Sequence, residues 1–157
     1  MSAVLADDEL LITRIFDAPA SLVFSLWTQA EHLKNWMGPE NFTCPVAEID
    51  FRVGGAYRAM IQSVEYGDSW FGGIYREIEP HSRLVFTFKW DGGPSADVET
   101  LITITFAEHD GKTTQTFHQT PFLDVERRDA HVGGWTSCFE KLGAYAARVE
   151  QEDRSAS

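Results

Sequence analysis

The pattern of apolar and polar positions begins with one short strand and two short helices. Residues 10–17, LLITRIFD, alternate and are rich in β-formers, which predicts a strand. Pro19 suits the first turn of a helix, and the apolar residues after it recur at helical spacing up to Thr28. Residues 30–39 predict a second short helix, which the Gly-Pro pair at its end terminates.

From Thr43 the pattern changes to repeated alternating segments separated by turn residues. Short turns between consecutive strands join antiparallel neighbours, so these segments predict a meander. Six strands are expected, over residues 46–53, 56–66, 69–79, 83–90, 97–108 and 112–120.

The last part of the chain returns to helical spacing. Between Leu123 and Glu150, apolar residues recur at three- and four-residue steps, which predicts one long amphipathic helix. Residues 151–157 are polar and are expected to form a frayed tail. We therefore expect a single α+β domain over 1–157 with its core at about 10–150, in which the long helix covers an antiparallel sheet.

Six collinear segments carry a resemblance to a known family: TRIFDAPASLVFSLWT, HLKNWMGP, IDFRVGGAYRAM, GGIYREIEPHSRLVFTFKW, TLITITF and GGWTSCFEKLGAY. Together they resemble the START-like (SRPBCC) superfamily and, within it, the group named after the activator of the heat-shock-protein-ninety ATPase. The resemblance implies a helix-grip (START-like, Bet v-like) fold, in which a seven-stranded antiparallel sheet wraps around a long C-terminal helix and encloses an internal cavity. The two short helices predicted above would lie between strands 1 and 2 of this sheet. The superfamily includes lipid carriers, hormone receptors, polyketide cyclases and proteins that act on chaperones.

Composition narrows the partners. The net charge of −11 disfavours a nucleic-acid backbone or an anionic membrane, because both would be repelled. No apolar run is long enough to span a bilayer, and no signal segment opens the chain, so we expect a cytoplasmic protein without membrane insertion. Cys44 and Cys138 have no metal or disulfide spacing and are expected to be buried hydrophobes.

The segment DFRVGGAYRAM, residues 50–60, places two glycines between alternating stretches. Gly54 and Gly55 are expected to form a tight hairpin turn. Asp50 and Arg52 would share one strand face, and pairing across the turn would bring Arg58 near them as an ion-pair ladder. The alternative is that Arg58 enters the cavity and meets a ligand oxygen.

Aromatic and apolar residues on the inward strand faces favour a pocket with a few polar anchors. The anchor candidates are Arg58, Tyr75, Glu77 and Gln119. The resemblance implies that Gln119 faces the cavity, either as a structural hydrogen-bonding group or as a group that orients a ligand. The full set of candidate ligand-binding residues is Trp36, Arg58, Met60, Trp70, Tyr75, Glu77, Phe86, Phe88, Phe117, Gln119 and Trp135.

Gly133 and Gly134, near the start of the long helix, cost helix stability. They are explained either by close packing of the helix on a strand or by space left for a ligand.

Catalytic motifs are largely missing. There is no nucleophile elbow and no histidine spacing typical of a metal site, so we predict no metal, no cofactor and no catalytic residue. The preferred function is binding of a small hydrophobic molecule that is aromatic or lipid-like. The alternatives are a cyclase- or hydrolase-type enzyme that uses the same cavity and a co-chaperone-like interaction module. A homodimer is left open.

Overall fold

A single seven-stranded antiparallel sheet forms the framework of the protein. The computed structural model describes residues 6–93, 96 and 98–156. The strands follow the order β1-β7-β6-β5-β4-β3-β2, and every neighbouring pair is antiparallel. Their bounds are β1 Leu10–Phe16, β2 Thr43–Ile49, β3 Ala56–Ser63, β4 Gly67–Glu79, β5 Arg83–Trp90, β6 Thr100–His109 and β7 Lys112–Thr120.

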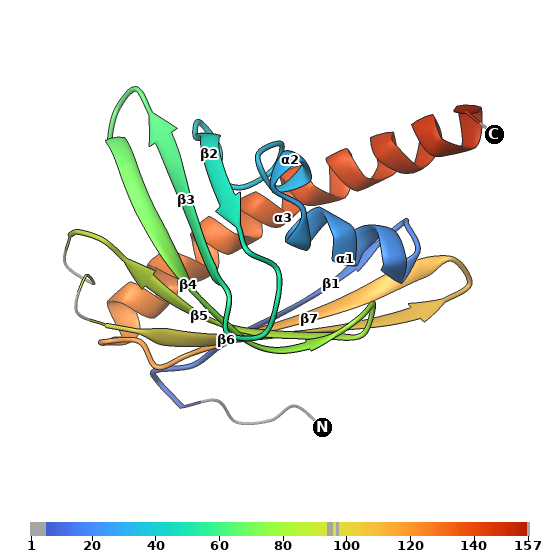
Figure 1. The fold of residues 1–157 in the computed structure, drawn as a ribbon. Helices are drawn as coiled ribbons and strands as arrows, with labels where there is room; N and C mark the ends of the chain where they lie inside the picture. The colour runs from blue at the N-terminus through green and yellow to red at the C-terminus, as the bar shows by residue number, and fades with distance from the viewer. Residues whose placement is uncertain (1–5, 94–95, 97, 157) are drawn as a thin grey trace.

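Three helices lie on the concave side of this sheet. The two short ones, α1 (Ala20–Thr28) and α2 (Ala30–Leu33), connect β1 to β2, and α3 (Val125–Ala156) follows β7. Figure 1 shows the sheet bending around α3, with β2 to β4 rising on one side and β1, β6 and β7 lying beneath the helix. This is the α+β helix-grip fold that the sequence predicted, with its two short helices in the expected place.

Alternation along the strands separates a buried face from an outer one. Ile102, Ile104 and Phe117 are completely buried on the inner face, where they belong to one core with Phe139 and Leu142 of α3. Directly opposite residues of antiparallel strands share a face, so the register extends this inner surface across the sheet. On β5 the residues that belong to this core are Leu84, Phe86 and Phe88, and on β6 they are Ile102, Ile104 and Phe106, which agrees with the apolar face of each sequence pattern.

The loop between β2 and β3 is wider than the sequence predicted. β2 ends at Ile49, so the strand does not continue to Val53, and Asp50 and Arg52 pair with each other locally at 3.0 Å. A Cβ on Gly55 would collide with the Asp50 carbonyl oxygen, which explains this glycine by close approach of the backbone. The expected ladder of Asp50, Arg52 and Arg58 is therefore absent, because Asp50 and Arg52 leave the sheet before they can oppose Arg58.

The C-terminal end of α3 and the first residue of β6 also differ from expectation. α3 continues to Ala156, where a frayed tail was predicted from residue 151; Gln151 and Glu152 are good helix formers that extend it. β6 begins at Thr100 rather than at Asp97, which lies outside the described residues. Within the described ranges, no helix is both long and apolar enough to cross a bilayer.

β4 and β5 approach each other closely around Thr87. The hydroxyl of Thr87 on β5 accepts a hydrogen bond from the Ile74 backbone N–H at 2.8 Å, and its carbonyl accepts one from Tyr57 Oη at 2.6 Å. A Cβ on Gly73 would collide with that same carbonyl. Glycine is therefore required at position 73 by the space between the strands.

We expect Gly73→Ala to reduce the free energy of unfolding by about 3 kcal/mol, because the added methyl group overpacks the β4–β5 contact. Urea denaturation monitored by tryptophan fluorescence would measure the loss. The matched control is Gly92→Ala, where the new Cβ meets nothing within 4 Å and the backbone is not left-handed, so the change should stay within about 0.5 kcal/mol. Equal effects of the two substitutions would contradict this explanation of Gly73.

Candidate ligand-binding cavity

A cavity of about 930 Å³ lies between α3 and the β3–β5 part of the sheet. Its volume falls in the range of small-molecule sites, and most of its surface is apolar. Four segments line it: the loop after α2, the β3–β4 hairpin, the end of β5 with the following loop, and one face of α3. The lining residues are Met37, Gly38, Pro39, Phe42, Ile61, Tyr66, Asp68, Ser69, Trp70, Phe71, Phe88, Trp90, Asp91, Gly92, Gly93, Ala130, His131, Gly134, Trp135 and Cys138.

Trp135 of α3 forms the deep wall of this cavity and is held by a buried hydrogen-bond chain. Its indole N–H donates to Gln119 Oε1 at 2.8 Å, and Gln119 Nε2 donates to Thr100 Oγ1 at 2.8 Å. The Thr100 hydroxyl in turn donates to the Phe88 carbonyl at 3.1 Å. Gln119 is completely buried behind the wall and does not line the cavity. Gln119 was expected to act either as a structural hydrogen-bonding group or as a group that orients a ligand. Both ends of its amide are engaged in positioning Trp135, which supports the first role.

The loop from Met37 to Phe42 closes one side of the cavity and is tied to α3. Lys141 Nζ donates to the carbonyls of Gly38 and Phe42 at 2.9 and 3.0 Å. Ser137 Oγ accepts a hydrogen bond from the Glu40 backbone N–H at 2.6 Å. These contacts fix the loop without filling the space beside it.

His131 lines the cavity from the first part of α3. Its Nδ1 lies 2.8 Å from the Arg127 carbonyl, so this nitrogen carries the proton, and Nε2 accepts the indole N–H of Trp90 at 3.0 Å. Burial lowers the pKa of His131, although the hydrogen bond to Arg127 acts in the opposite direction. A neutral ring therefore bridges α3 and β5 at neutral pH.

Gly134 leaves open space on the cavity side of α3. A Cβ at Gly133 or Gly134 would meet nothing within 4 Å. Close packing of the helix on a strand therefore does not explain these glycines. Gly134 lines the cavity and Gly133 does not, so only Gly134 adds to the cavity volume.

The predicted site residues are of three kinds: those that line a cavity, those buried in the core behind it and those that point away from it. Trp70, Phe88 and Trp135 line the large cavity. Tyr75 and Phe86, together with Phe88 and Trp135, line a much smaller one of about 20 Å³ that shares part of the same wall and has room for a single water at most.

Trp36 and Phe117 are completely buried core residues that line neither cavity. The indole N–H of Trp36 donates to the Leu26 carbonyl at 3.0 Å, which binds it to α1. Both side chains support the site only through packing.

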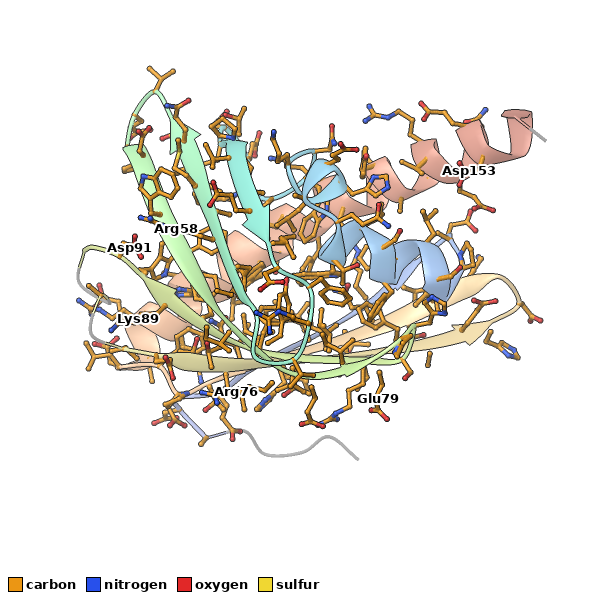
Figure 2. The ribbon with its side chains drawn as sticks, viewed as in Figure 1. Arg58, Arg76, Glu79, Lys89, Asp91 and Asp153 are labelled. Atoms are coloured by element: carbon orange, nitrogen blue, oxygen red, sulfur yellow. The ribbon has the colours of Figure 1, made fainter. Side chains whose placement is uncertain are left out.

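Three predicted residues point away from the cavity. Met60 and Arg58 alternate with the inward residues of β3 and lie on the outer face of the sheet, and Glu77 is exposed and pairs with Arg83 at 3.5 Å. Arg58 forms an ion pair with Asp91 at 2.5 Å, and Figure 2 shows both side chains on the outer side of the sheet near the end of β5. Arg58 therefore does not reach into the cavity, and it does not join the ladder expected with Asp50.

Sequence reasoning missed most of the loop residues and part of the α3 face. Ala130 and Cys138 lie four residues on either side of Gly134, and this helical spacing could have placed them on the cavity side. Met37 to Phe42 and Tyr66 to Ser69 carry no such periodicity, since loops approach the cavity only through the tertiary fold.

The two cysteine thiols of the protein are weak nucleophiles at neutral pH. Cys138 lines the cavity, but burial raises the pKa of this thiol to about 12, and burial also raises the pKa of Cys44. Both thiols are therefore protonated at neutral pH. Among the described residues, no three His, Cys, Asp or Glu side chains are grouped so that they could hold a metal ion.

A sheet that grips one long helix, with an aromatic cavity between them, defines a START-like protein of the SRPBCC superfamily. Residues 17–147 match the family described as "Activator of Hsp90 ATPase homolog 1-like protein". The chain belongs to that family.

Solved structures support the same assignment. Protein CV1439 from Chromobacterium violaceum is 29% identical, with a TM-score of 0.77 over 87% of this chain and 95% of that one. The AHSA1 protein from Silicibacter pomeroyi is 24% identical, with a TM-score of 0.77 over 92% of this chain and 99% of that one, which shows a shared fold. No curated protein matches the chain.

The neutral bridge at His131 predicts a pH effect on stability. Because its pKa is lower in the folded protein than in the unfolded chain, the unfolded state takes up the proton first as the pH falls. The contribution of the neutral His131 bridge to the free energy of unfolding is therefore fully present above about pH 6.5. It decreases as the pH falls toward the pKa of His131 in the folded protein. We expect the loss of unfolding free energy between pH 7.5 and 5.5 to be smaller in His131→Gln than in the wild type.

The control for this measurement is His109→Gln, in an exposed hairpin turn. It should lose as much stability over this pH interval as the wild type. Parallel pH profiles for the wild type and His131→Gln would contradict the neutral bridge.

Proposed function

We propose that this protein reversibly binds a small hydrophobic molecule, aromatic or lipid-like, in the cavity between α3 and β3–β5. The observation that carries the proposal is the cavity itself, about 930 Å³ in volume and walled by Phe71, Phe88, Trp90 and Trp135. Pockets of this size with mainly apolar walls are the usual form of a small-molecule site.

Apolar burial would supply most of the affinity. Transfer of apolar surface from water is worth about 25 cal/mol per Å², so a ligand of two fused rings gains several kcal/mol before the cost of association is subtracted. Polar groups on the rim would orient the ligand rather than hold it.

The enzyme hypothesis has less support. It expects a titratable cavity group with a shifted pKa and free room beside it. His131 has the shifted pKa, but both ring nitrogens are already hydrogen-bonded within the protein.

The interaction-module hypothesis expects a collapsed cavity and an exposed apolar patch. Val64 and Tyr66 are exposed at the tip of the β3–β4 hairpin. The open cavity favours ligand binding over this alternative. A cytoplasmic location, a single domain over 1–157 and a homodimer remain predictions.

Native mass spectrometry of the purified protein, before and after denaturation, is the direct test. A co-purifying small molecule that is released on denaturation would support the proposal and identify the ligand class. A thermal-shift screen with hydrophobic aromatic and lipid compounds complements it, because a ligand that binds only the folded state raises the melting temperature. An empty protein with no shift across the panel would count against the proposal.

Gly134→Leu should block binding while keeping the fold. The new side chain starts from open space on the cavity side, and removal of a helical glycine favours α3 by about 1 kcal/mol. We expect a higher melting temperature without ligand and a loss of at least about tenfold in affinity for any compound that the screen identifies.

Gly133→Leu is the matched control, since it removes the neighbouring glycine at an equally open position outside the cavity lining. It should raise the melting temperature similarly and leave affinity unchanged. If both variants bind as the wild type does, the ligand lies elsewhere.

A further inference from the structure

We propose that the Ser69 hydroxyl orients an uncharged aromatic ligand in this cavity by hydrogen-bonding to a hydroxyl or carbonyl oxygen of that ligand. This inference rests on the proposed function, because it concerns the ligand of the same cavity. It is carried by the position of Ser69 on the inner face of β4 and by the engagement of the other polar side chains around the cavity.

Ser69 lies near the start of β4 with its side chain on the inner face of the sheet. In the β3–β4 register it is directly opposite Ile61, which belongs to the hydrophobic core, and directly opposite residues share a face. Both residues line the cavity. Asp68 and Trp70, on either side of Ser69, direct their side chains to the outer face, because successive residues of a strand point to opposite faces.

The hydroxyl of Ser69 has no hydrogen-bond partner in the part of the chain that the structure describes, and the residue is partly buried. A hydroxyl donates one hydrogen bond and accepts two, so a ligand hydroxyl or carbonyl oxygen satisfies it. A ligand that covered it with apolar surface would leave it without a partner, which costs free energy. Ser69 therefore favours a ligand that carries an oxygen at this place.

The ionised groups nearest to the cavity are already engaged. Asp68 accepts a hydrogen bond from the amide of Gln62 at 2.7 Å on the outer face, and Asp91 pairs with Arg58 at 2.5 Å. Lys141 lies against the loop after α2, where its amine donates to two backbone carbonyls. An ionised group of a ligand within the cavity would therefore lose its hydration without gaining an ion pair, which is costly.

The nitrogen-bearing side chains on the inner wall are engaged as well. One ring nitrogen of His131 is bonded to a backbone carbonyl, and the other accepts the indole N–H of Trp90. The indole N–H of Trp135 donates to Gln119 behind the wall. These groups hold the cavity in shape and are not available to a ligand.

Cys138 and Tyr66 are the two further lining residues that carry a polar hydrogen. The thiol of Cys138 is a weak hydrogen-bonding group, and it contacts the backbone of Gly38. Tyr66 is 69% exposed at the tip of the β3–β4 hairpin, where water competes for its hydroxyl. Among the described lining residues, Ser69 is therefore the inward-facing hydroxyl that remains for a ligand.

Three buried rings provide the surface against which the apolar part of the ligand would lie. Phe71 stacks on Phe88 with centroids 5.0 Å apart, and Trp135 packs edge-on against Phe88 at 5.9 Å. All three line the cavity. Phe71 is two residues from Ser69 on the same face of β4, a separation of about 7 Å along the strand. An aromatic compound that lies against these rings would therefore present a substituent on its edge to Ser69.

The test uses four probes that share a naphthalene ring: 2-naphthol, 2-methylnaphthalene, 2-naphthoate and 2-naphthylmethylammonium. Their dissociation constants would be measured by isothermal titration calorimetry at pH 7. We expect 2-naphthol to bind about fivefold more tightly than 2-methylnaphthalene, because it gains a hydrogen bond to Ser69. Both ionised probes should bind about tenfold more weakly than 2-naphthol, because neither charge finds a partner in the cavity.

Ser69→Ala isolates the contribution of the hydroxyl. It should lower the affinity for 2-naphthol to that for 2-methylnaphthalene, and it should leave the melting temperature of the free protein unchanged because no hydrogen bond within the protein is lost. Ser69→Thr keeps a hydroxyl on a residue suited to a strand and should keep the preference for 2-naphthol. Ser82→Ala is the control, because it removes a hydroxyl from an exposed turn outside the cavity lining.

The outcomes separate the two proposals. If 2-naphthol binds no more tightly than 2-methylnaphthalene, keeps its advantage in Ser69→Ala, or is matched by an ionised probe, the inference about Ser69 is overturned and the binding function stands. If no probe binds, the molecule released in native mass spectrometry takes their place, and an ionised molecule or an unchanged affinity in Ser69→Ala overturns the inference. If no probe binds and no molecule is released, the binding function fails and the inference fails with it.

Discussion

Two buried tryptophans that donate hydrogen bonds to glutamines of one strand set the position of the helices on the sheet. Trp27 of α1 donates to Gln115 Oε1 at 2.7 Å, and Trp135 of α3 donates to Gln119 Oε1 at 2.8 Å. Both glutamines are completely buried on the inner face of β7. Because a buried indole N–H is costly without a partner, these bonds fix how α3 is rotated as well as where it lies. That rotation turns His131 and Gly134 toward the cavity.

The cavity persists because its walls are stiffened at several points and contain little that could fill it. Lys141 and Ser137 hold the loop after α2 against α3, and His131 bridges α3 to Trp90 of β5. Gly134 contributes open space where a side chain would enter. Interlocked aromatic rings, such as Trp135 with Phe117 at 4.7 Å, resist collapse because they are already closely packed against one another.

The family assignment gives the fold of this chain, and the cavity is a feature of its own side chains. The fold is that of the Activator of Hsp90 ATPase homolog 1-like family, and the cavity is the feature on which the proposed binding of a small molecule rests. Arg58, near the end of β5, is engaged by Asp91 and Trp70 on the outer face.

The sequence by itself determined the element order, the antiparallel meander and the inward faces of β5 and β6, because these depend on local periodicities of two and 3.6 residues. It also placed Trp70, Phe88 and Trp135 among the cavity residues. The tertiary structure alone decided that Arg58 and Met60 lie outside, that Gln119 is a structural support and that the loop after α2 closes the site. The physical reason is that strand register, the early end of β2 and the rotation of α3 are set by contacts between residues far apart in the chain, and local patterns do not encode them.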